Sequence, residues 1–124
     1  MPHRINWKNS NFEAEFFGEV SAAEIDEVNM IFCGDERFDM VRTSIWDMSR
    51  ITQLTIEFGE IEYAAAFDKG ASTSKASLKG AIVVPDSHVR QLVETYLSIS
   101  NELDNGWDTR LFDNIESARK WIES

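Results

Sequence analysis

This sequence is poor in basic residues. Its 124 residues include 12 Lys and Arg against 22 Asp and Glu, so the formal net charge is −10. Proteins bind nucleic acids and anionic membrane surfaces through clustered Lys and Arg, and the sequence contains no such cluster. We therefore expect no nucleic-acid partner, and we regard the acidity chiefly as a source of solubility.

Residues that hold metals or perform nucleophilic chemistry are equally scarce. Cys33 is the single cysteine, which excludes an internal disulfide and any multi-cysteine metal site. His3 and His88 are the only histidines, and they share no metal-binding spacing. The sequence also lacks a glycine-rich phosphate loop and an assignable nucleophile–base pair. We therefore expect no cofactor, no metal site and no enzymatic activity.

Long apolar runs are missing as well. The longest strictly apolar stretches, such as residues 64–67 and 81–85, are far too short to cross a bilayer. The first ten residues have no apolar core of a secretory signal. We therefore expect a cytoplasmic protein without membrane insertion. The hydrophobic content of 43% is sufficient for one domain that spans residues 1–124.

The first half of the chain predicts two strands, a helix, a third strand and a second helix. Polar residues at 8–11 separate two strands, and apolar residues alternate along the second of them from Phe12. Ser21 and Glu24 form a capping box that begins a helix ending near Gly34. A third strand is expected over 40–48. A second helix is expected from Thr55 to Lys69, and its inner stripe consists of Leu54, Phe58, Ile61 and Ala65.

The second half continues this alternation. Residues 69–77 are small and polar and predict a loop, and a nearly continuous apolar strand follows over 78–84. Asp86 or Ser87 is expected to cap a third helix. A short strand over 107–112 then precedes a last helix, with Asp113 as its expected cap. The order ββαβαβαβα predicts an α/β domain with a mostly parallel sheet packed by helices, because parallel neighbours need crossover connections.

Three stretches in this order resemble a known family: "FFGEVSAAEID" (16–26), "TSIWDMSRIT" (43–52) and "RLFDNIESARKWI" (110–122). Together they resemble the STAS family, the sulfate-transporter and anti-sigma-factor-antagonist domain, and in particular its SpoIIAA-like branch of small bacterial proteins, also described as STAS/SEC14-like. The resemblance implies a mixed five-stranded sheet packed by four helices. It also implies regulated protein–protein recognition without catalysis.

The first candidate site follows the third strand and comprises Asp47, Ser49, Thr52 and Thr55. In the anti-sigma antagonists this region leads to a phosphorylatable serine within an Asp-Ser-Ser-Gly-like motif, which this chain lacks. Asp47 has two interpretations, organisation of the loop after it or contact with a partner or ligand. Thr52 and Thr55 could accept phosphate at a helix N-terminus or act as ordinary caps, and Ser49 shares this ambiguity. We expect a partner or switch surface over residues 47–58.

The second candidate site is aromatic. The chain is rich in aromatic residues, and most of them are expected in the core. A remnant could line an apolar pocket between the second helix and the sheet, and we assign it the four residues Trp46, Phe58, Tyr63 and Phe67.

Two functions follow from these sites. The first is a non-enzymatic regulatory module that binds an unknown protein partner and forms a homodimer. The alternative is a carrier or sensor of an apolar small molecule or lipid.

Overall fold

The computed structural model describes residues 3–84 and 87–124. Its elements, in chain order, are β1 (His3–Lys8), β2 (Asn11–Ser21), α1 (Ala22–Gly34), the 3-10 helix η1 (Glu36–Met40), β3 (Thr43–Thr55), α2 (Phe58–Ser74), β4 (Lys79–Val83), α3 (Ser87–Glu102), β5 (Asp108–Phe112) and α4 (Ile115–Ile122). The predicted order ββαβαβαβα is confirmed. Within these residues no helix is long and apolar enough to span a membrane.

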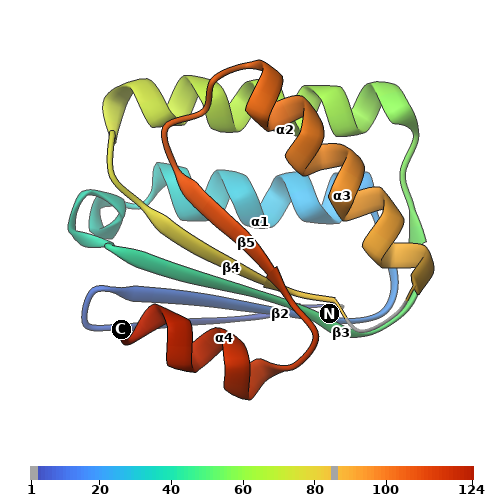
Figure 1. Cartoon of the computed structure of the whole chain (residues 1–124), viewed down its shortest axis with the longest axis horizontal. Coiled ribbons are helices and arrows are strands. Elements are labelled where there is room, and N and C mark those ends of the chain that lie inside the picture. Colours follow the sequence, from blue (N-terminus) through green and yellow to red (C-terminus); the bar gives the residue numbers. More distant parts are fainter. Residues whose placement is uncertain (1–2, 85–86) are drawn as a thin grey trace.

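The sheet is mixed, and its strand order equals the chain order. Its five strands are arranged β1-β2-β3-β4-β5; β1 runs antiparallel to β2, and the other neighbours are parallel. When successive parallel strands are added to the same side of a sheet through right-handed crossovers, the connecting helices all lie on the same face of the sheet. Accordingly, α1, α2 and α3 lie together on one face of the sheet, whereas α4 covers the other face (Figure 1).

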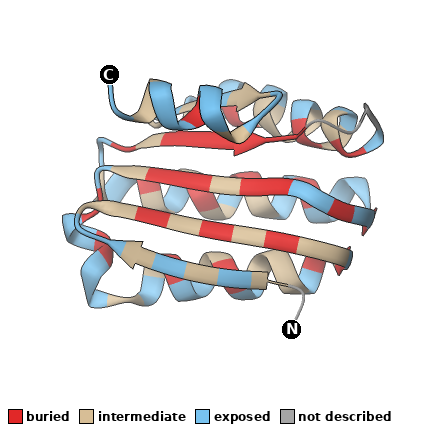
Figure 2. Cartoon of the chain, turned by 90° about the horizontal axis from the view of Figure 1, so that it is seen from below, coloured by how far each residue is buried: buried red, intermediate tan, exposed pale blue. Residues whose placement is uncertain are grey.

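The two faces of the sheet carry separate cores. Phe12, Ala14 and Phe16 of β2 point towards the three crossover helices and are fully buried, as their alternation predicts. On the other face, Ala118 of α4 packs with Ile45 of β3 and with Ala81 and Val83 of β4. This alternation of buried and less buried residues is visible along the strands in Figure 2.

Helix caps agree with the sequence only in part. The Glu24 N–H donates to the Ser21 hydroxyl at 3.4 Å, so Ser21 caps α1 as predicted. The N-cap of α4 is Asn114, whose side chain accepts from the Ser117 N–H at 2.8 Å, and the expectation of Asp113 was wrong. The expected cap at Asp86 or Ser87 lies outside the residues whose side chains are described.

The end of β3 and both ends of α2 differ from the prediction. The strand covers Thr43–Thr55 instead of 40–48, because β2 continues alongside it as far as Ser21. Gly18 has a φ of +76° where the register between these two strands shifts, a conformation that favours glycine. The helix begins at Phe58, and the expected loop over 69–77 is helical as far as Ser74.

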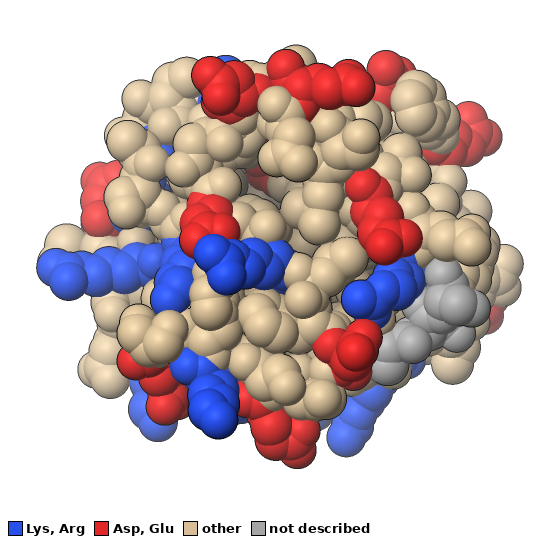
Figure 3. Space-filling view, viewed as in Figure 1, with Lys and Arg blue, Asp and Glu red and all other residues tan. Residues whose placement is uncertain are grey.

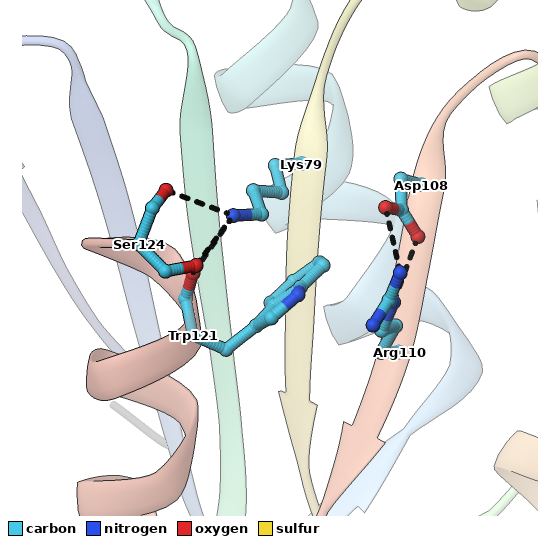
Figure 4. Close-up of polar contacts among 5 residues, drawn as sticks. All are labelled: Lys79, Asp108, Arg110, Trp121 and Ser124. Carbon is cyan, nitrogen blue, oxygen red and sulfur yellow. Dashed lines mark hydrogen bonds and ion pairs between the residues drawn. The ribbon is translucent and has the colours of Figure 1, made fainter.

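Trp121 fixes the end of α4 to the sheet. The Lys79 ammonium nitrogen lies 4.5 Å from its ring centroid, and the Arg110 guanidinium carbon lies 4.9 Å away. Lys79 also donates to the Trp121 carbonyl at 2.8 Å (Figure 4). A cation is favourable at a helix C-terminus and over an aromatic ring. Lys79 therefore stabilises the end of α4 through both the Trp121 ring and the Trp121 carbonyl.

Candidate functional site

The predicted partner surface lies on a strand and not on a loop. Ser49, Thr52 and Thr55 belong to β3 and are exposed. The N-cap of α2 is Glu57, in a capping box with Glu60, so the expectation of Thr52 or Thr55 at a helix N-terminus was wrong. Neither threonine therefore has the free helical N–H groups that would favour a phosphate.

Asp47 binds the backbone of its own strand. Its Oδ1 accepts from the Ser49 N–H at 3.0 Å and from the Ser49 hydroxyl at 2.6 Å. The side chain is buried at the last position where β3 pairs with β4. These two hydrogen bonds hold the chain where it passes the end of the neighbouring strand.

Beyond Asp47, β3 runs past β4. The pairing of β3 with β4 ends at Asp47 and Val83, whereas its pairing with β2 continues to Thr55. From Ile51 to Thr55 only the β2 side of the strand is paired within the described ranges. Figure 2 shows this end of β3 extending beyond β4 with exposed residues on it.

The four aromatic residues assigned to a pocket do not line one cavity. Trp46 lines a cavity between the helices and the sheet. Phe58 and Tyr63 are 60% and 55% exposed, and Phe67 contacts the Tyr63 ring on α2. None of these last three lines the cavity, so their assignment to a pocket was wrong. Phe58 was also wrongly placed on the inner stripe of the helix.

The cavity has a volume of about 110 Å³ and lies under the three crossover helices. Its walls are mostly apolar: α1 contributes Ile25 and Phe32, α2 contributes Ile61 and Ala64, α3 contributes Leu92 and Val93, and the strands contribute Met48, Gly80 and Ile82. Asp68 is the one residue with a charged side chain among the described lining residues. A mostly apolar space with a single acidic group therefore lies between the helix layer and the sheet.

Asp68 connects all three crossover helices. Its Oδ1 accepts from the Asn29 side-chain amide of α1 at 2.7 Å, and its Oδ2 accepts a short hydrogen bond from the Tyr96 hydroxyl of α3. The residue is 8% exposed, and no ion pair involves it in the described parts of the chain. Buried carboxylates normally have a cationic partner, and Asp68 has only neutral donors.

Burial controls the ionisation of this group and its neighbours. Burial raises the pKa of Asp68 above its usual range, while the hydrogen bonds from Tyr96 and Asn29 oppose that shift. The pKa of Tyr96 is raised well above its ordinary value, first by burial and then by the adjacent carboxylate. Burial and the charge of Asp68 also raise the pKa of Cys33 to about 12, which keeps its thiol protonated.

This shift predicts a pH-dependent stability that Asp68→Asn should remove. Because the pKa of Asp68 is higher in the folded than in the unfolded state, the folded protein holds this proton more tightly. The free energy of unfolding of the wild type should therefore fall relative to the variant as the pH rises from about 4, and level off above the folded-state pKa. Urea unfolding across this range measures it, with Glu62→Gln on the exposed face of α2 as the control. A pH-independent difference would contradict the prediction.

Comparison with solved structures identifies the architecture. The anti-sigma factor antagonist SpoIIAA in its unphosphorylated form superimposes with a TM-score of 0.65 at 11% identity, covering 98% of each chain. The chain has the SpoIIAA-like fold. The Bacillus cell fate determinant SpoIIAA in its phosphorylated form gives 0.60 at 12% identity, over 96% of this chain and 98% of that one. No protein-family model and no curated protein sequence matches the chain.

A third structure extends the comparison to a protein of unknown role. It is an uncharacterized DUF3478-family protein with a SpoIIAA-like fold from Shewanella loihica PV-4, with a TM-score of 0.52 at 11% identity over 97% of this chain and 91% of that chain. At these identities the likeness concerns the fold. It confirms the SpoIIAA-like architecture that the three sequence stretches indicated.

Sequence reasoning about this SpoIIAA-like chain missed the acidic residue of the cavity. Asp68 follows Ile61 by seven residues and Ala65 by three, so it continues the inner stripe of the second helix. An acidic residue on an apolar stripe was the available signal. The predicted helix ended at Lys69, one residue after Asp68, whereas the buried stripe continues to Ser72.

Proposed function

We propose that this SpoIIAA-like chain is a non-enzymatic regulatory module that binds a partner protein along the free end of β3. The observation that carries the proposal is the strand edge from Ile51 to Thr55, which is unpaired on one side in the described structure. Such an edge is a template for an added strand, because no described strand pairs with it on that side. The single cysteine favours a cytoplasmic setting.

The surface next to this edge indicates the chemistry of the partner. Glu57, Glu60 and Glu62 lie at the start of α2, together with the exposed rings of Phe58 and Tyr63. Figure 3 shows acidic side chains along the margin of the molecule that α2 forms. The complementary partner is an extended segment with basic and apolar side chains. This surface overlaps the partner surface that the sequence predicted over residues 47–58, and it extends further along α2.

A photo-crosslinking residue at Gln53 tests this surface. We expect it to capture a discrete partner, whereas the same residue at the exposed Ser117 of α4 should capture none. The double variant Thr52→Lys, Thr55→Lys should reduce recovery about tenfold, which corresponds to about 1.4 kcal/mol, because it adds two positive charges to a surface expected to bind a basic segment. A product of twice the 14.2 kDa chain would identify a homodimer. Equal capture from both positions would exclude this surface.

The cavity supports a second function, a carrier or sensor of a small apolar molecule. The observation that favours it is a mostly apolar space of about 110 Å³ with one acidic residue in its described lining. Ligand sites in proteins commonly combine apolar walls with a few polar groups that orient the ligand. This space uses Trp46 from the pocket predicted by sequence, and it lies deeper than the exposed aromatic residues of α2. Binding there is compatible with partner binding at the strand edge.

A further inference from the structure

The position of Asp68 is unusual for a purely structural acid. Asp68 is 8% exposed and borders a cavity whose other described lining residues are uncharged. Water therefore screens its charge poorly. A carboxylate offers about four acceptor positions, and Asn29 and Tyr96 use two of them. Acceptor capacity therefore remains on a group that has no cation beside it in the described structure.

The wall around this acid is suited to an organic cation. Trp46, Trp107 and Phe32 all line the cavity, and aromatic faces attract cations as well as apolar groups. The indole N–H groups are already committed, since Trp46 donates to the Ser44 hydroxyl at 3.2 Å and Trp107 donates to the Lys75 carbonyl at 2.7 Å. Among the described lining residues, Asp68 is the one that offers a charged group to a ligand.

We propose that the cavity binds a small molecule with a protonated amine on a short apolar body, and that the Asp68 carboxylate receives the amine. This inference rests on the carrier function and names the chemical class of its ligand. The ammonium group supplies the counter-charge that the buried acid lacks, and the hydrocarbon contacts the apolar walls. A neutral or anionic ligand of equal size supplies no such charge.

The volume limits the size of the ligand. An apolar cavity of about 150 Å³ accommodates benzene, so a space of about 110 Å³ suits a body of four or five heavy atoms. We therefore expect short alkylamines to fit and long-chain lipids to be excluded unless the helices separate. Affinity for so small a ligand should be on the order of millimolar.

Two ligands that differ in charge and hardly in shape provide the test. The folded protein is titrated with n-butylamine and with n-butanol at neutral pH, while NMR follows the Asn29 side-chain amide and the two indole N–H groups that border the cavity. We expect the wild type to bind the amine at least about tenfold more tightly. Asp68→Asn should remove this preference and leave butanol binding within about twofold. Glu62→Gln, which removes an exposed charge from the same helix, should behave as the wild type.

The possible outcomes separate the ligand class from the carrier function. If the wild type binds butanol as tightly as butylamine, the amine assignment is wrong and the carrier function stands. If neither compound shifts the indole or Asn29 signals, both the carrier function and the amine assignment fail, and the strand-edge proposal is unaffected. The comparison between the two compounds is made in the wild type, so it holds even if Asp68→Asn does not fold.

Discussion

Replacing Phe32 by alanine should lower the free energy of unfolding by about 3–5 kcal/mol, the range for large core aromatics. Phe32 is 1% exposed, and its ring stacks on Phe12 with centroids 4.3 Å apart. It also meets the Phe38 ring edge-on at 4.9 Å and the Trp46 ring at 5.7 Å. One side chain thus joins α1, η1 and the two longest strands, and its removal adds empty volume next to an existing cavity.

The control for this prediction lies on the same helix. Met30 is 59% exposed, so Met30→Ala should change the free energy of unfolding by no more than about 0.5 kcal/mol. Urea unfolding followed by tryptophan fluorescence measures both variants. If Phe32→Ala does not fold, Phe32→Leu should fold and show a smaller loss. A loss in Phe32→Ala as small as that of Met30→Ala would mean that this aromatic cluster contributes little.

Replacing Tyr96 by phenylalanine should cost about 1–3 kcal/mol at neutral pH, the penalty for leaving a buried acceptor unsatisfied. The hydroxyl is one of two donors to Asp68, and phenylalanine keeps the ring while removing that donor. The loss should be smaller in acid, because the hydroxyl stabilises the ionised carboxylate more than the protonated acid. Removing it should therefore raise the pKa of Asp68 further.

Tyr63 provides the matched control, because its side chain is 55% exposed on α2. Tyr63→Phe makes the same chemical change at a solvated hydroxyl, so its stability should stay within about 0.5 kcal/mol of the wild type at every pH. Thermal and urea unfolding of both variants at neutral and acidic pH give the comparison. Equal losses for the two substitutions would show that Asp68 gains nothing from the Tyr96 hydroxyl.

Local patterns predicted most of this fold. Phe12, Ala14 and Phe16 alternate as a half-buried strand should, and all three are fully buried. Leu54 shows where local patterns fail. It fits the helical spacing of Ile61 and Ala65, yet it lies in β3 opposite Val20. That pairing depends on the length of β2 and on the register shift beside Gly18, which the spacing of apolar residues around Leu54 does not reveal.

The site was harder to predict for the same reason. Asp68 binds Asn29 and Tyr96, which lie 39 and 28 residues away along the chain. Each residue occupies the inner stripe of its own helix, and the three meet only because the crossovers place those helices on one face. Periodicity indicates which face of a helix is buried, but not which buried residues of separate helices face one another. The strand edge was missed because the prediction ended β3 at Met48.

The identity of strand order and chain order has a consequence for biosynthesis. Each strand that leaves the ribosome finds its neighbour among residues already made, and the longest strands, β2 with 11 residues and β3 with 13, come early. Assembly can therefore advance along the chain with each crossover helix folding onto a sheet edge already present. Helix α4 packs on β3 and β4, which precede it in the chain, and Trp121 contacts Lys79 and Arg110 on that face.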